Sequence, residues 1–183
     1  PRAGRAGGGR GVERLGGPGV DGSGRSRRPL IGARGGGGHR VGVVPGLGLN
    51  ASGIAATAVA VREHVEARGL GASRGLVIVG HSKGGLIGKH LMVHLDPDQR
   101  VSAMITVNTP FSGSRRARWL PLPAVRVFVP GGAVLSDLER ATAVNARITS
   151  VYSAIDPNIP GSRRLGGATH VASDAHGHVW DLS

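Results

Sequence analysis

The pattern of apolar and polar positions divides the chain into two parts. Residues 1–40 show little periodicity, whereas from Val41 onward short apolar runs alternate with stretches in which apolar residues recur every three or four positions. Continuous apolar runs are typical of buried strands, and the wider spacing is typical of amphipathic helices. The pattern therefore predicts a disordered or poorly packed first segment, 1–40, and one domain over 41–183 in which strands and helices alternate.

The strands and helices of this domain can be placed from the same pattern. Strands are expected at 41–44, 76–79, 101–107, 148–153 and 169–172, and helices at 54–68, 84–95 and 134–144. Because the strands are apolar throughout, they indicate a parallel sheet that is covered by helices. The expected fold class is α/β, with a mostly parallel sheet and helices on both faces.

The run from 76 to 87 carries the clearest chemical signal. It sets the pentapeptide Gly-His-Ser-Lys-Gly between an apolar strand and a helical pattern, which is the context of a nucleophile elbow. In such a turn the hydroxyl of Ser82 stands above the sheet and the backbone N–H of Lys83 points to the same spot, so that one turn supplies nucleophile and oxyanion donor. We expect glycine at Gly80 and Gly84 because a Cβ at either would collide with the turn. On the pentapeptide alone, an exposed serine in a glycine-rich turn is the alternative.

Two further polar residues occupy equivalent places after the next strands. Ser82, Asn108 and Asp156 come soon after the second, third and fourth predicted strands. Ligands of open parallel sheets bind at the carboxyl ends of the strands. Three polar groups after three successive strands therefore indicate a site better than any one of them.

A nucleophilic serine needs a base, and the base needs a carboxylate that orients it. Asp156 precedes His178, which lies near the end of the chain, and this gives the order Ser, Asp, His found in α/β-hydrolases. Asp156 also stands before a proline, as ordinary turn residues often do. His176 competes with His178 for the role of base, and Asp174 is a weaker alternative acid.

No cofactor or metal is expected. The chain has no cysteine, which excludes disulfides and thiolate metal sites. The glycines at 35–38 precede a predicted strand, so they do not form a dinucleotide-binding fingerprint. His90 and His94 are spaced i, i+4 on a predicted helix and could bind a metal together, but the sequence shows no third ligand for it.

The net charge of +12 first suggests a nucleic-acid partner. Only 3% of the residues are aromatic, however, and nucleic-acid binding faces usually interleave aromatic with basic side chains. The charge is also uneven, because residues 1–40 hold nine arginines against two acidic residues, Glu13 and Asp21. We attribute the excess of arginine and glycine to a GC-rich coding sequence and expect no nucleic-acid partner.

The sequence leaves compartment and oligomeric state open. No apolar run approaches the roughly 20 residues that span a bilayer, so no transmembrane segment is expected. Pro1 is not an initiator methionine, and we interpret the natural start as lying upstream, where a signal peptide would be out of view. Both a cytoplasmic and a secreted protein fit this pattern.

Four motifs within 41–183 together resemble one family. Residues 80–86 look like the elbow of bacterial triacylglycerol lipases and related esterases of the α/β-hydrolase superfamily, and residues 107–114 look like the stretch after the next strand of those lipases. Residues 156–160 resemble their acid turn. Residues 166–171 and 177–179 resemble their final segment, in which a Gly-His pair carries the base. The resemblance implies Ser82 as nucleophile, Asp156 as acid and His178, which follows a glycine, as base. It also implies hydrolysis of a small-molecule ester or lipid through an acyl-enzyme, without a cofactor.

The first 40 residues depart from this family. The family places a first oxyanion loop well before the elbow, and its best counterpart here is 18–20, with the Val20 N–H as second oxyanion donor. An apolar helix should follow, but residues 21–28 read Asp-Gly-Ser-Gly-Arg-Ser-Arg-Arg. We hypothesise that this segment is a frame-shifted or corrupted reading of a hydrolase N-terminus. Resequencing the gene and finding the same frame below a normal start would contradict this hypothesis.

Two alternative functions follow from the same features. A catalytically impaired hydrolase remnant would explain the altered N-terminus, and a basic nucleic-acid-binding module driven by residues 1–40 is the less favoured third choice. Residues 111–133 hold several large apolar side chains and form either a cap over an acyl pocket or an ordinary packed connection.

Overall fold

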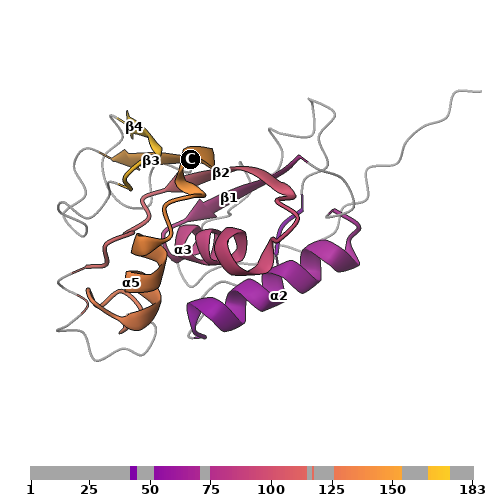
Figure 1. Ribbon diagram of the computed structural model, residues 1–183, viewed down its shortest axis with the longest axis horizontal. Coiled ribbons are helices and arrows are strands. Elements are labelled where there is room, and N and C mark those ends of the chain that lie inside the picture. Colours follow the sequence, from indigo (N-terminus) through magenta and orange to yellow (C-terminus); the bar gives the residue numbers. More distant parts are fainter. Residues whose placement is uncertain are drawn as a thin grey trace, which may run out of the picture. The chain divides into compact units, whose positions relative to one another are not determined.

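The computed structural model describes residues 42–44, 52–70, 75–114, 117, 126–153 and 165–173. All of them belong to the second of the chain's two units, Gly42–Ser183. In chain order they form helix α2 (Ile54–Ala67), strand β1 (Leu76–His81), helix α3 (Lys83–His90) with its π-helical continuation η2 (Leu91–Leu95), strand β2 (Val101–Val107), helix α5 (Ala133–Arg140), the 3₁₀ turn η4 (Asn145–Arg147), and strands β3 (Ile148–Ser153) and β4 (Thr169–Ser173). Figure 1 shows how these elements are arranged.

The four described strands form one parallel sheet in the order β1-β2-β3-β4. At its carboxyl edge His81 pairs with Val107, Val107 with Val151, and Val151 with Val171. β1 and β2 end at this level, and β3 and β4 end two residues further on, at Ser153 and Ser173. The segments that follow all four strands therefore start from the same edge of the sheet. The α/β class with a parallel sheet, expected from the continuous apolar runs, is confirmed.

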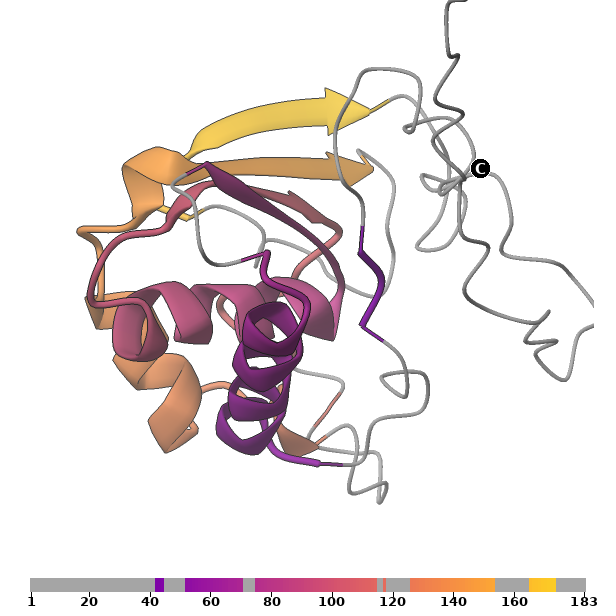
Figure 2. The same ribbon diagram turned by 90° about the vertical axis from the view of Figure 1, so that its right-hand side faces the viewer.

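Helices α2, α3 and α5 lie on one face of this sheet (Figure 2). The hydrophobic core fills the space between the two layers. Its buried side chains include Ile54, Ala58, Leu86, Ile87, Leu91, Met104, Leu135, Leu138 and Ile148. The approach of α3 to the sheet depends on Gly88, because a Cβ there would lie 2.6 Å from the Sδ of Met104.

The opposite face of the sheet carries apolar side chains that the described residues leave open. Val77, Val79 and Val171 are 51%, 48% and 44% exposed, and Ile105 is 38% exposed. Side chains alternate between the two faces along a strand, so these residues point away from the core. Every described helix lies on the other face, so the expectation of helices on both faces is confirmed for one face only.

Three of the predicted elements differ from the observed ones in type or by more than two residues at one end. The strand expected at 41–44 is wrong for residues 42–44, which join no strand, and Val43 is 55% exposed. An apolar run indicates burial but supplies no pairing partner. The helix expected over 84–95 is α-helical only to His90 and π-helical beyond it, and the helix expected over 134–144 ends at Arg140, where Ala141 leaves helical geometry with ψ 82°.

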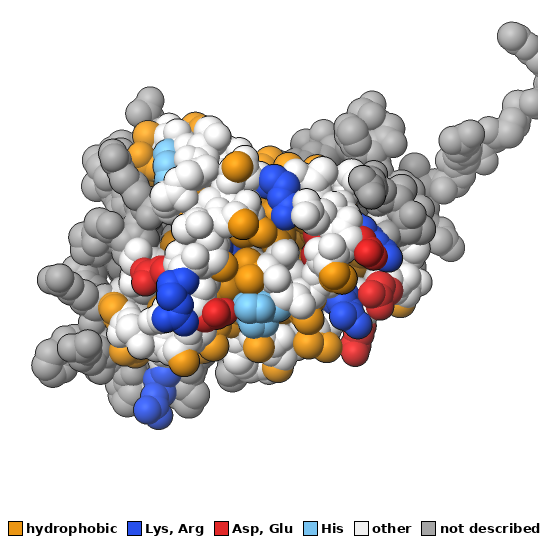
Figure 3. Space-filling view, in the orientation of Figure 1, with side chains coloured by type: hydrophobic (Ala, Val, Ile, Leu, Met, Phe, Trp, Pro, Cys, Tyr) orange, Lys and Arg blue, Asp and Glu red, His pale blue; other side chains and the backbone are white. Residues whose placement is uncertain are grey.

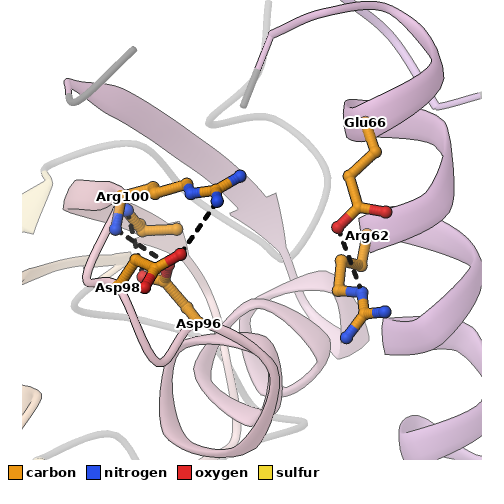
Figure 4. Close-up of polar contacts among 6 residues, drawn as sticks. Arg62, Glu66, Asp96, Asp98 and Arg100 are labelled. Atoms are coloured by element: carbon orange, nitrogen blue, oxygen red, sulfur yellow. Dashed lines mark hydrogen bonds and ion pairs between the residues drawn. The ribbon is translucent and has the colours of Figure 1, made fainter. Parts of the chain in front are cut away.

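The turn that leads into β2 is fixed by one carboxylate. Asp96 accepts hydrogen bonds from the backbone N–H groups of Arg100 at 2.8 Å and Val101 at 3.0 Å, and Arg100 in turn pairs with Asp98 at 2.8 Å (Figure 4). The two backbone bonds close the turn and set where β2 begins. This register matters because β2 adjoins the strand that ends at the elbow.

Basic and acidic side chains are interspersed on the face of the described residues shown in Figure 3. On α2, for example, Arg62 pairs with Glu66 at 3.4 Å. Exposed pairs of this kind contribute little to stability. None of the described helices is long and apolar enough to cross a membrane.

Phe111 begins the stretch expected to form either a cap or a packed connection. Its side chain is 2% exposed and belongs to the hydrophobic core with Leu135 and Leu138. At this residue the chain therefore packs into the core. Trp119, Leu120 and Leu122, on which a cap would also depend, lie outside the described residues.

Candidate active site

Ser82 alone separates β1, which ends at His81, from α3, which begins at Lys83. Its φ of 52° and ψ of −119° are uncommon for a residue with a side chain. Such a conformation costs on the order of 1–3 kcal/mol and persists only where the surroundings enforce it. The tight strand-to-helix turn predicted from the pentapeptide is present, with the serine at its most constrained position.

Three hydrogen bonds hold this turn in place. The N–H of Ser82 donates to the carbonyl of Val107 at 2.8 Å. The carbonyl of Ser82 accepts from the N–H of Gly85 at 3.1 Å and from the Oγ1 of Thr109 at 3.0 Å. Both sides of the serine are thereby tied to β2 and the loop after it, which enforces the strained angles.

The glycines around the serine have different roles. A Cβ on Gly80 would lie 2.7 Å from the carbonyl carbon and oxygen of Gly84, so the expected collision at Gly80 is confirmed. At Gly84 the expectation is wrong, because no atom lies within 4 Å of an added Cβ. The crowded position is Gly85, where a Cβ would lie 2.1 Å from the Oγ1 of Thr109. The first turn of α3 points Gly85, and not Gly84, toward the loop after β2.

Asn108 repeats the elbow's geometry on the neighbouring strand. It follows β2 as Ser82 follows β1, has a φ of 48°, and donates its N–H to the carbonyl of Val151 at 2.9 Å. Its side chain is 1% exposed. Because the strands pair at His81 and Val107, Ser82 and Asn108 stand next to each other at the carboxyl edge. Two of the three polar residues predicted to share this edge are therefore brought together.

The remaining predicted site residues are not described by the structure. Asp156 and His178, the alternative acid Asp174 and base His176, and the second oxyanion donor Val20 all lie outside the described residues. The strands that lead to the first two are described, and both end at the edge where Ser82 stands.

Two contacts of the elbow were not apparent from the sequence. Thr109, which supports the serine carbonyl, stands 27 residues away from it. The Nζ of Lys83 donates to the backbone carbonyl of Ser52 at 2.5 Å across 31 residues. Burial lowers the pKa of the Lys83 amine below its usual value. The Thr-Pro pair in the lipase-like stretch 107–114 was a signal for the first contact, whereas no local pattern marks the second.

The rings of the two helical histidines lie close together, and one of the two histidines contacts a carboxylate. The Nε2 of His94 lies 2.7 Å from an Oδ of Asp137 on α5, and the rings of His90 and His94 stand 4.6 Å apart. Burial lowers the pKa of His90, and the nearby His94 acts in the same direction. In the described part of the chain, no three His, Cys, Asp or Glu side chains are placed to hold a metal ion.

Comparison of the sequence with protein-family models and with curated proteins gives no match. Among solved structures, the lipase BlEst2 of Bacillus licheniformis in its propeptide form is similar with a TM-score of 0.51 and 19% identity, over 71% of this chain and 37% of that one. A hydrolase from Pseudomonas aeruginosa has a TM-score of 0.44 and 17% identity, over 69% of this chain and 65% of that one. A monoacylglycerol lipase of Paleococcus ferrophilus has a TM-score of 0.45 and 13% identity, over 70% of this chain and 68% of that one.

The likeness to the Bacillus lipase in propeptide form bears on the fold alone. Together with the parallel sheet and the strained elbow, the similarity to the Bacillus lipase shows that the chain has a fold of the α/β-hydrolase type. The chain spans less than two thirds of the length of the Bacillus lipase in propeptide form and of the Pseudomonas hydrolase.

Proposed function

We propose that the chain is a serine hydrolase of carboxylic esters, similar to lipases and esterases. The observation that carries the proposal is the backbone of Ser82, which is strained, held by three hydrogen bonds and placed between a strand and a helix at the carboxyl edge of a parallel sheet. This is the architecture that presents a serine hydroxyl to a substrate. The structural neighbours, two of which are lipases by name, support the same class of reaction.

In the proposed mechanism His178 removes the proton of the Ser82 hydroxyl, and the serine oxygen attacks the ester carbonyl. Asp156 orients the imidazole of His178 and stabilises the imidazolium that forms. The backbone N–H groups of Lys83 and Val20 donate to the oxyanion. His178 then protonates the leaving alcohol, and water hydrolyses the acyl-enzyme by the same route in reverse.

Chain geometry supports these roles. Asp156 is three residues past the end of β3, and His178 is five residues past the end of β4. Adjacent strands lie about 4.8 Å apart, which puts β4 about 14 Å from β1. A segment of five residues spans up to about 17 Å. Both side chains therefore start within reach of Ser82.

The partner we propose is a small-molecule ester or lipid. Nucleic acid is not part of the proposal, because basic and acidic side chains are interspersed on the described surface shown in Figure 3. A cap formed by residues 111–133 is not part of it either, since Phe111 packs into the core.

Labelling with a fluorophosphonate probe tests the proposal. The folded wild-type chain should react, and Ser82→Ala and His178→Ala should both abolish the reaction. Ser102→Ala, at an exposed serine on β2, and His176→Ala, at the competing histidine, are the matched controls and should label normally. Labelling that survives Ser82→Ala would refute the assignment. A folded wild-type chain that does not label would favour the impaired remnant.

A further inference from the structure

The side chain of Lys83 joins the elbow to the start of α2. Its Nζ donates to the carbonyl oxygen of Ser52 at 2.5 Å. Ser52 stands directly before Gly53, the residue that caps α2. The two partners are 31 residues apart, so this contact holds together two segments that the local sequence does not connect.

Ile54, the first residue of α2, packs into the hydrophobic core, and the segment that Lys83 contacts lies just before it. Gly53 makes no side-chain capping bond, and Ser52 and Gly53 are both exposed. The Oγ1 of Thr57 donates to the carbonyl of Gly53 at 2.9 Å, which closes the first turn of α2 but does not tie it to the elbow. Lys83 supplies that connection from the residue next to the candidate nucleophile.

The ammonium group suits this task. Hydrogen bonds from a charged donor are shorter and stronger than those between neutral groups. The side chain of Lys83 is partly shielded from water, and burial lowers the pKa of its amine. The contact therefore ties the exposed residues just before α2 to the elbow.

We propose that Lys83 is a positioning residue whose ammonium pins Ser52 and Gly53 beside Ser82, so that the entry to α2 forms one wall of the ester site. The proposal rests on the proposed function. The backbone N–H of Lys83 donates to the oxyanion, whereas its side chain acts on the neighbouring segment. One residue thus serves the reaction through two different groups.

Hydrogen exchange tests the contact without relying on activity. In Lys83→Met the amides of residues 57–60, the first in α2 that can be bonded within the helix, should exchange about three- to tenfold faster than in the wild type, the effect expected for one lost hydrogen bond. Lys83→Arg keeps a charged donor and should restore protection to within about twofold of the wild type. Arg62→Met, which removes an exposed cation of α2, is the control and should leave these amides unchanged. Unchanged exchange in Lys83→Met would overturn the proposal.

Ester kinetics test the consequence for the site. A loosened wall weakens substrate and transition state alike, so Lys83→Met should raise KM for p-nitrophenyl hexanoate more than it lowers kcat. Lys83→Arg should return KM toward the wild-type value. Equal KM in Lys83→Met and wild type, or a loss of kcat that arginine does not rescue, would overturn the proposal. If the folded wild type neither labels nor hydrolyses esters, the proposed function fails, while the exchange experiment still decides whether Lys83 holds the start of α2.

Discussion

Lys89 on α3 carries a charge where the fold offers it little compensation. Its side chain is 0% exposed, and its Nζ has no hydrogen-bond partner among the described residues. The Nζ lies 5.9 Å from the centre of the Phe111 ring. Burial lowers the pKa of Lys89 to about 8, although the carboxylate of Glu139 on α5 acts in the opposite direction. Replacing Lys89 by methionine should therefore stabilise the protein.

The size of the effect follows from the two pKa values of Lys89, 10.5 in the unfolded chain and about 8 in the folded one. Below pH 8 both states are protonated, and the difference between the two pKa values corresponds to a penalty of about 3 kcal/mol on the folded state. Between pH 8 and 10.5 the unfolded chain binds more protons, so the free energy of unfolding rises with pH. Above that range the penalty is gone.

Methionine keeps an unbranched apolar stem and removes the amine. At pH 7 Lys89→Met should raise the free energy of unfolding by about 2–3 kcal/mol, and at pH 10.5 by much less. Urea unfolding followed by circular dichroism at both pH values measures this difference, and other titrating groups cancel between the two proteins. Arg62→Met, at an exposed arginine, should change neither value. A Lys89→Met protein that is less stable than wild type at pH 7 would refute the reasoning, because the amine would then have a favourable environment.

Three further substitutions follow from the geometry. Asp96→Ala removes the acceptor of two backbone N–H groups and should lower the free energy of unfolding by about 2 kcal/mol in urea titrations. Asp98→Ala, in an exposed pair, should lower it by less than about 1 kcal/mol, and equal losses would argue against a special role of the turn. Gly85→Ala should lower the melting temperature measurably because its Cβ would lie 2.1 Å from the Oγ1 of Thr109, while Gly84→Ala should be tolerated. A larger loss in Gly84→Ala than in Gly85→Ala would show that the elbow is packed differently. Thr109→Val removes the hydrogen bond to the carbonyl of the elbow serine and should slow fluorophosphonate labelling about tenfold, so an unchanged rate would mean that the remaining bonds suffice to hold the turn.

The sequence pattern predicted the parts of the fold that depend on local burial. Strands 101–107 and 148–153 appear as expected because a continuous apolar run fits the interior of a parallel sheet. The run at 41–44 has the same character, yet residues 42–44 join no strand. The difference lies in the pairing partner, which an apolar run does not specify.

In the candidate site, too, the local features were predicted from the sequence and the long-range contacts were not. The strand, serine and helix of the elbow follow from neighbouring residues and were predicted from them. The contacts that hold the elbow, from Thr109 and from Lys83 to Ser52, join residues 27 and 31 positions apart. Likewise, the motif predicted a collision at Gly84, where an added Cβ would meet no atom within 4 Å. Such contacts depend on how helices sit on the sheet, which only the folded chain determines.

The backbone conformation of Ser82 and the reactivity of its side chain can be tested separately. Its positive φ is enforced by backbone contacts with Val107 and Gly85 and by the hydroxyl of Thr109, none of which uses the serine oxygen itself. An alanine at position 82 would meet the same constraints and keep the same turn, whereas a glycine would also relieve the strain. A gain in stability of Ser82→Gly would therefore measure what the fold gives up to hold a side chain in this conformation.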